Sequence, residues 1–326
     1  MNIKKIGLTA LAGSLVATSA FAGEMSIAGS AKFSYMTDEA AAVASPYAMD
    51  QELTATGSAE LDNGMTISVS HALTSTGSGS STSSLSLNMG DMGTLSYSDT
   101  DIGGGLKALD DITPTAYEEV TNGMTGAAQA AAANGAGFTW GTSMGGAAVS
   151  VMYSDNVNAT TARSDGSDDN TAASASSSHG IGVTYPVADT GLTIYGGVGT
   201  EGQADSTEID HTTIGVKYAY GPVTVGMQVN DEDNTAADNT VAADEDLETT
   251  IVGLSFMVND NLSVSYGEHT TTSTASGAVD QEIEGMSVSY SMGGITISAY
   301  DNEGTAISNV SGSNIDSQEI LVSFAF

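Results

Sequence analysis

The final stretch of the chain, ILVSFAF at residues 320–326, alternates large apolar side chains with other residues. Side chains of an extended strand point alternately to its two sides, so the large apolar ones share one face. They are Ile320, Val322, Phe324 and Phe326. A water-soluble protein would have to bury this face against its own core. The remainder of the sequence favours a different solution, in which the apolar face contacts lipid.

The chain begins with the features of a secretory signal peptide. Lys4 and Lys5 form a basic start, an apolar stretch covers residues 6–16, and a small-residue box ends at Ala22. Such a segment is removed after export, so we predict a signal peptide at residues 1–22 and one barrel domain at residues 23–326. A structural N-terminal helix is the alternative interpretation. No other stretch approaches the ~18 consecutive apolar residues that a membrane-spanning helix needs.

The composition indicates β-structure and an acidic surface. The 326 residues include 39 Gly and no Cys, and 40 acidic residues against 6 basic ones give a formal net charge of −34. The lack of cysteine excludes a small disulfide scaffold. Abundant Gly, Ser and Thr argue against helices. The negative charge argues against nucleic acid as a partner, because it repels phosphates.

Segments with strict period-two alternation recur along the chain. In MTISVS (residues 65–70) and PVTVGMQVN (residues 222–230), apolar side chains alternate with Thr, Ser, Gly or Gln. This pattern predicts strands with two different environments. Short segments rich in Gly, Asn and Asp predict tight hairpin turns between pairs of strands. These turns lie at residues 62–64, 90–93, 145–146, 188–191, 221–222, 259–261 and 293–294.

Longer polar loops separate the hairpins, at residues 37–50, 74–81, 99–136, 154–178, 200–208, 230–246, 267–281 and 301–316. Seven tight turns and eight long loops connect sixteen strands. An even strand number, with short turns at one end and long loops at the other, is typical of an outer-membrane barrel. We therefore predict an all-β fold, a single sixteen-stranded antiparallel transmembrane β-barrel in the outer membrane of a Gram-negative bacterium. A soluble exported β-sandwich would need a second apolar face, where this chain has small polar residues.

Aromatic residues near the predicted strand ends support two belts at the membrane interfaces. The belt near the tight turns comprises Tyr185, Tyr218, Tyr220, Tyr290 and Phe326. The belt near the long loops comprises Tyr35, Tyr97, Tyr153, Tyr266 and Tyr300. The general frequency of Tyr in strands is the alternative explanation.

With these features, the sequence resembles the trimeric porins of Gram-negative bacteria over essentially its whole mature length. The resemblance rests on the strand that ends in Phe326, the strand number, and the longest loop after the fifth strand. It also rests on the hairpin MGDMGTLSYS (residues 89–98), which is similar to the Gly-Asp-aromatic-Gly-Thr turn of that family. The resemblance implies a homotrimer, a pore-constricting loop at about residues 99–136, and a C-terminal strand that is read by the outer-membrane assembly machinery.

The chain departs from this family in its basic residues. The family often places Gly-Arg after the fifth strand and an arginine cluster opposite an acidic loop. Here the segment at residues 96–101 reads SYSDTD, and the only arginine of the predicted mature chain is Arg163, in a long outer loop. The resemblance therefore does not extend to the arginine–acid arrangement. The second long loop is also short, which weakens the carry-over of a trimer latch.

The predicted constricting loop carries four carboxylates, Asp110, Asp111, Glu118 and Glu119. Carboxylates in a confined channel favour cations and oppose anions, so we expect a cation-preferring pore. A solvated surface loop is the alternative. Lys32 and Lys217 alternate with apolar neighbours and are expected on the pore wall, with a structural or snorkelling lysine as the alternative.

Acidic clusters in other outer loops are weak calcium candidates, because calcium binds carboxylate oxygens. The candidates are Asp165, Asp168, Asp169, Asp231 and Asp233. None matches the EF-hand pattern, and solvated acidic loops are the preferred interpretation. The four histidines show no zinc spacing. We therefore expect neither a metal nor a cofactor.

The sequence thus predicts passive diffusion of small hydrophilic solutes, with no catalysed reaction. The GTSMG segment (residues 141–145) matches a nucleophile-elbow pattern, but it runs into a hairpin turn instead of a helix. The alternatives are a solute-specific channel, a structural or adhesive barrel with a plugged lumen, and an outer-membrane hydrolase acting through Ser143. The expected partners are outer-membrane lipid, small solutes and cations, the assembly machinery, and two further copies of the chain.

Overall fold

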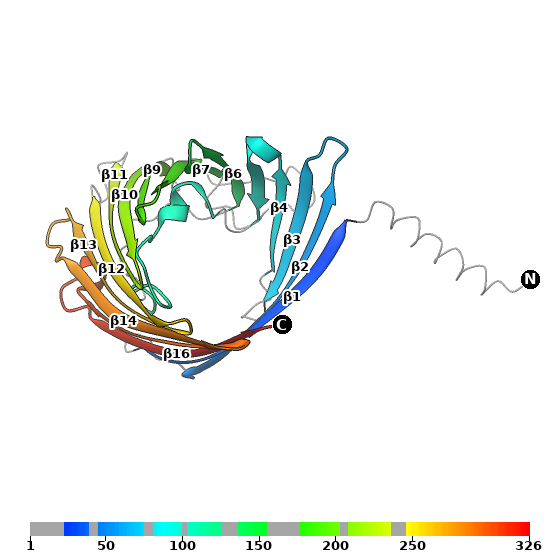
Figure 1. The fold of residues 1–326 in the computed structure, drawn as a ribbon. Helices are drawn as coiled ribbons and strands as arrows, with labels where there is room; N and C mark the ends of the chain where they lie inside the picture. Colours follow the sequence, from blue (N-terminus) through cyan, green and yellow to red (C-terminus); the bar gives the residue numbers. More distant parts are fainter. Residues whose placement is uncertain are drawn as a thin grey trace, which may run out of the picture.

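The computed structural model describes residues 23–38, 45–74, 81–99, 103–124, 136–154, 177–202, 208–235 and 246–326. These residues form sixteen antiparallel strands that close into a barrel, because each strand pairs with its neighbours in sequence and β1 pairs with β16 (Figure 1). The predicted fold class is therefore confirmed. The predicted signal peptide, residues 1–22, lies outside the described residues.

The strands are β1 (Glu24–Asp38), β2 (Tyr47–Glu60), β3 (Thr66–Thr74), β4 (Ser81–Asn88), β5 (Thr94–Ser98), β6 (Gly137–Met144), β7 (Ala147–Ser154), β8 (Ser178–Val187), β9 (Leu192–Gly202), β10 (Glu208–Tyr220), β11 (Val223–Thr235), β12 (Leu247–Asn259), β13 (Leu262–Ser273), β14 (Gln281–Met292), β15 (Ile295–Thr305) and β16 (Ile315–Ala325). Short 3-10 helices are η1 (Gly90–Met92), η2 (Gly105–Leu109) and η3 (Ile307–Asn309). Within the described part of the chain, no helix has the length and apolar character to cross a membrane.

Several strands extend into segments that the sequence pattern assigned to loops. β2 begins at Tyr47, β13 continues to Ser273, and β15 continues to Thr305. The predicted loops at residues 37–50, 267–281 and 301–316 were therefore too wide. The backbone ladder continues through polar residues, so a loss of hydrophobic alternation does not mark the end of a strand.

Burial alternates along the strands and identifies their two faces. In β14, Ile283 is 2 % exposed inside the barrel and Met286 is 63 % exposed outside. Ile320, Phe324 and Phe326 are exposed on the outer face of the last strand, as predicted. Val322 shares that face by alternation and is partly covered. The outer surface of the barrel is thus the apolar one.

The barrel is closed by the pairing of the first and last strands. Gly29 and Phe326 exchange two backbone hydrogen bonds of 2.8 Å each. The ring of Phe326 lies over Gly29 and leaves no room for a Cβ atom there. Ser30 is paired with Ala325, and the register continues to Asp38 and Ser317. The final residues therefore complete the hydrogen-bond ladder that the bilayer requires.

One residue of the predicted aromatic belts lies inside the barrel. Tyr300 is 4 % exposed, and its ring stacks on Tyr117 with a centroid distance of 6.2 Å. The prediction that Tyr300 belongs to the aromatic belt near the long loops was wrong, because a position near a strand end does not determine which face of the strand a side chain takes. Tyr35, Tyr153 and Tyr266 of the same predicted belt are exposed.

A row of carboxylates crosses the outer face of β13–β16 on the long-loop side. Glu268 is directly opposite Glu284, Glu284 is opposite Glu303, and Glu303 is opposite Asp316. All four side chains are exposed. The Tyr266 hydroxyl lies 2.8 Å from Glu268 Oε1 and 2.7 Å from Glu284 Oε2. We call these four carboxylates the acidic row; like charges directly opposite one another destabilise a sheet.

We predict that salt stabilises the barrel by screening the acidic row. The screening length falls from ~30 Å at ~0.01 M salt to ~3 Å at ~1 M. The urea midpoint of the folded protein should therefore rise with NaCl, and Glu303→Gln should raise low-salt stability by roughly 0.5 kcal/mol. Glu282→Gln is the control, because Glu282 is opposite Thr270 and Thr305. Equal effects of the two variants would contradict the prediction.

Candidate functional site

The loop between β5 and β6 folds into the barrel. Its described part, residues 103–124, lies along the inner wall in Figure 1, with β1–β3 on the opposite side of the barrel. We call residues 103–124 the inner loop. At its start, η2 contacts β7, β8 and β9. At its end, Met124 and Val120 pack with the buried Ile283 and Ile307, so the inner loop follows the wall through most of the second half of the barrel.

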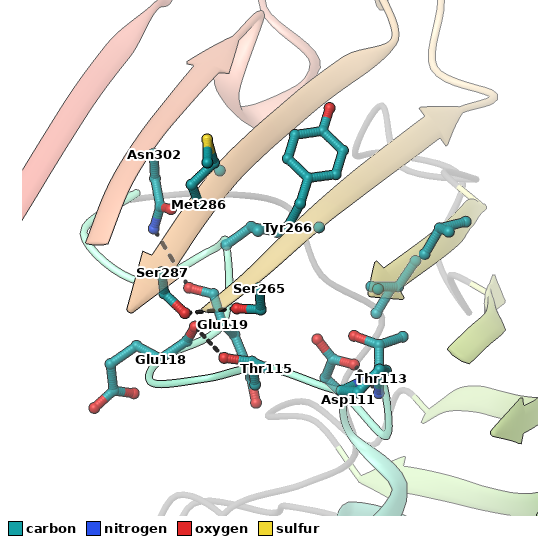
Figure 2. Close-up of a pocket in the computed structure, with 17 residues that line it drawn as sticks. Asp111, Thr113, Thr115, Glu118, Glu119, Ser265, Tyr266, Met286, Ser287 and Asn302 are labelled. Carbon is teal, nitrogen blue, oxygen red and sulfur yellow. Dashed lines mark hydrogen bonds between the residues drawn. The ribbon is translucent and has the colours of Figure 1, made fainter. Parts of the chain in front are cut away.

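Side chains of the wall hydrogen-bond the backbone of the inner loop. Figure 2 shows Ser265, Ser287 and Asn302, from three neighbouring strands, beside the loop. The bonds run from Gly105 N to Ser150 Oγ (2.8 Å), from Ile112 N to Gln228 Oε1 (2.8 Å), from Ala116 N to Ser265 Oγ (2.9 Å), from Tyr117 N to Ser287 Oγ (3.1 Å) and from Asn302 Nδ2 to Asn122 O (3.1 Å). These bonds satisfy backbone groups that the loop would otherwise leave unpaired beside the wall.

Gln228 of β11 uses both ends of its amide on the inner loop. Its Nε2 donates to Leu109 O at 2.6 Å and to Asp110 O at 2.7 Å, while its Oε1 accepts from Ile112 N. The side chain is fully buried. Because both ends of the amide are engaged, Gln228 fixes the backbone that carries Asp110 and Asp111.

Three of the four predicted carboxylates come together. Asp110, Asp111 and Glu119 line one small cavity between the inner loop and the wall. The remaining lining residues are Thr121, Asn230, Ile251 and His269. Glu118 does not join them. It is exposed, and in Figure 2 its side chain points away from the strands.

The surroundings of the aspartates favour their neutral forms. Burial raises the pKa of the Asp110 carboxyl, and the charge of Asp111 raises it further, against an opposing effect of Lys107. Burial also raises the pKa of the Asp111 carboxyl, although a hydrogen bond from Thr113 N at 2.6 Å and the charge of Lys217 act in the other direction. Each aspartate therefore has a lysine nearby that partly offsets its charge.

Glu119 has the most perturbed carboxyl of the group. Burial is the largest cause, followed by the charges of Asp111, Asp110 and Glu118, and together they raise the pKa of Glu119 to about 7. A side-chain hydrogen bond with Thr121 acts in the opposite direction. The charge of this carboxyl therefore changes near neutral pH.

Both predicted wall lysines lie on the inner face of the barrel. Lys217 is half-buried, and its Nζ lies 5.4 Å from the centroid of the Tyr195 ring, within the range of a cation–π contact. Lys32 is exposed on β1. It shares a face with Met36, whose sulfur lies 3.7 Å from the hydroxyl of the lumenal Tyr300.

Sequence reasoning missed two inward carboxylates on β2. Asp50 is directly opposite Lys32 in the strand register, and Glu52 follows on the same face. Their outward neighbours Met49 and Leu53 are 59 % and 43 % exposed. The signal is the alternation YAMDQEL at residues 47–53, whose first four residues fall within the predicted loop at residues 37–50. The wall across from the inner loop thus carries carboxylates as well as a lysine.

Tyr117 and Glu319 form a second missed contact. The Tyr117 hydroxyl donates to Glu319 Oε2 at 3.1 Å, which places Glu319 on the inner face of β16. Burial, and next the Glu319 charge, raise the pKa of Tyr117, so its hydroxyl stays protonated and remains a donor. No sequence pattern indicated this pair, because its members are far apart in the chain.

The structure describes two of the five weak calcium candidates. Asp165, Asp168 and Asp169 lie outside the described residues. Asp231 and Asp233 are exposed on the outer face of β11. Within the described ranges, no group of three or more His, Asp or Glu side chains has an arrangement that could hold a metal ion.

Comparison with solved structures supports the fold. The chain is similar to OmpT, an outer membrane protein of Vibrio cholerae, with a TM-score of 0.69 at 10% identity, covering 93% of this chain and 98% of that chain. It is similar to an anion-selective porin from Comamonas acidovorans (TM-score 0.67, 14% identity) and to a three-substitution mutant of the Rh. blastica porin (TM-score 0.64, 15% identity), each covering 93% of this chain and 100% of that chain. At these identities the likeness concerns the fold alone.

Comparison of sequences supplies the family. A search of curated proteins finds no match. The family model of the Gram-negative porins matches residues 7–308, which is most of the chain. The sixteen-stranded closed barrel agrees with that match. This chain belongs to the Gram-negative porin family and is a channel protein of the outer membrane.

Proposed function

We propose that this protein is a passive diffusion pore for small hydrophilic solutes that prefers cations, with the inner loop as its constriction. It catalyses no reaction and needs no cofactor. The observation that carries the proposal is the cluster of Asp110, Asp111 and Glu119 on a loop that lies inside the barrel. Carboxylates in a narrow passage attract cations and repel anions.

The charges on the two sides of the lumen support a cation preference. Lys107 and Lys217 partly offset the two aspartates, but Glu118 is exposed, and Asp50 and Glu52 lie with Lys32 on the wall across the barrel. The Comamonas acidovorans porin is anion-selective and shares the fold. The fold therefore does not decide the sign of the preference, and these side chains do.

We predict that the refolded protein conducts in a planar bilayer and gives a cation-selective reversal potential in a salt gradient. The Glu118→Gln, Glu119→Gln double variant should move the reversal potential towards zero, because it removes two negative charges from the passage. Glu282→Gln, on the outer face, is the matched control and should leave it unchanged.

An anion-selective reversal potential would contradict the charge assignment and leave the pore intact. Silence from protein that is shown to be folded and inserted would contradict the pore. The structural or adhesive barrel would then be the better interpretation.

We predict that cation selectivity depends on pH near neutrality. With its pKa at about 7, Glu119 is negative above that pH and neutral below it, so the cation preference should decrease as the pH is lowered from about 8 to about 6. Glu119→Gln identifies the group, because it should remove the step near pH 7. A step that persists in this variant would assign it to another group.

We further propose that the protein assembles as a homotrimer. Within the described residues, β4, β6 and β7 have 8 residues each and β5 has 5, whereas a tilted strand needs about 9–11 residues to cross the bilayer. A wall of such short strands is better covered by protein than by lipid. The resemblance to trimeric porins supplies the number of three.

We predict that the detergent-solubilised protein has the mass of three chains, and that conductance appears in groups of three steps. Both follow if the short wall of β4–β7 is covered by neighbouring copies. A monomeric mass under conditions that keep the barrel folded would contradict the assembly, without affecting the pore itself.

A further inference from the structure

Glycines recur on the inner face of the barrel where the inner loop touches the wall. Gly226 of β11, Gly253 of β12 and Gly267 of β13 lie on three successive strands, and Gly215 and Gly304 extend the series to β10 and β15. We call these five residues the glycine track. None of them has a positive φ, so ordinary strand geometry would accept a side chain at each position.

The inner loop occupies the space that side chains would need. A Cβ atom on Gly226 would lie 2.7 Å from Pro114 Cδ, and one on Gly253 would lie 2.8 Å from Thr113 Cβ. The equivalent distance at Gly267 is 2.9 Å, to Val120 Cγ1. Atoms at these separations overlap, so any residue larger than glycine requires the facing side chain, the loop or the strand to move.

A glycine of the inner face that does not lie under the inner loop serves as a comparison. Gly141 of β6 shares the inner face with Thr139, which contacts Gly104 of the loop. The nearest heavy atom to a Cβ on Gly141 is at 3.9 Å. The inner face at Gly141, away from the inner loop, therefore has room for a methyl group, whereas Gly226, Gly253 and Gly267 do not. Glycine weakens the interior of a strand and often marks the close approach of another backbone.

The glycine track alternates with the residues that bond the loop. In β11, β13 and β14, a glycine and a hydrogen-bonding side chain are two positions apart on the same face: Gly226 and Gln228, Gly267 and Ser265, Gly285 and Ser287. Gly285 itself contacts Asn302 of the neighbouring strand and not the loop. In β11 and β13 the polar residue supplies the bond, and the track glycine lets the loop come close enough to make it.

We propose that the glycine track sets the open cross-section of the pore by setting how closely the inner loop lies against the wall. The track residues are positioning residues for the constriction, and the size limit for solutes is encoded in the wall as much as in the loop. This inference rests on the proposed function as a diffusion pore.

A matched pair of substitutions tests the proposal. Gly267→Ala places a methyl group against Val120 Cγ1, so it should displace the loop into the lumen and reduce single-channel conductance and the largest solute that passes. Val120→Ala removes the Cγ1 atom that the new methyl group would meet. The Gly267→Ala, Val120→Ala double variant should therefore regain the wild-type conductance and solute size limit. Gly141→Ala is the control and should conduct as the wild type does.

Gly253→Ala should lose more conductance than Gly267→Ala, because Thr113 Cβ and the Pro114 ring cannot rotate away.

Hydrogen exchange of the loop amides gives a second readout that does not depend on conductance. Gly267→Ala should speed exchange at Ala116 and Tyr117, whose amides bond Ser265 and Ser287, and the double variant should slow it again. Unchanged exchange and conductance in Gly267→Ala would overturn the proposal. So would a loss that Val120→Ala does not restore, or an equal loss in Gly141→Ala.

The two readouts separate the two proposals. A wild-type protein that does not conduct would overturn the pore. If the amides of the inner loop exchange faster in Gly267→Ala and the double variant reverses this change, the glycine track positions the inner loop, whether or not the protein conducts.

Discussion

Each backbone amide and carbonyl in the apolar part of a membrane needs a partner within the protein, and this constraint organises the whole molecule. It requires the pairing of β1 with β16 and the two bonds between Gly29 and Phe326. Closure leaves the outer face to apolar side chains and encloses a polar interior. The interior then accepts a loop that carries its own backbone groups, provided that the wall supplies partners for them.

The inner loop meets that condition through the wall and not through its own secondary structure. Beyond η2, residues 110–124 contain no regular helix or strand. Gln228, Ser265 and Ser287 take the place of a ladder by bonding its amides. The same contacts bring buried carboxyls together, and burial then keeps the pKa values of Asp110, Asp111 and Glu119 above their usual range. The close packing of the inner loop against the wall thus determines both the shape of the candidate site and the charge of its carboxyls.

The strand number and the outward face of Ile320, Phe324 and Phe326 could be predicted from sequence, because lipid selects apolar side chains at every second position. Strand ends could not be predicted, because polar residues such as Asp50 and Glu52 of β2 continue the backbone ladder beyond the apolar band.

The candidate site was predictable only in part. Its carboxylates lie in one loop, but their wall partners, Gln228 among them, are more than a hundred residues away in sequence. Tyr300 shows the remaining difficulty, since one step in register moves a ring from lipid to lumen. The recurring glycine and polar residue two positions apart was a readable signal, and it indicates a packed backbone and not a flexible one.

The acidic row affects the local pH at one mouth of the barrel. The chain has a formal net charge of −34, and the acidic row lies on the long-loop side of the barrel. The resulting negative potential concentrates cations, protons included, near that mouth of the barrel. The local pH there lies below that of the bulk when salt is scarce, and approaches the bulk value as salt screens the potential. The bulk pH at which Glu119 loses its charge therefore shifts upward in dilute media, so that acidity and salinity act on the same carboxyl.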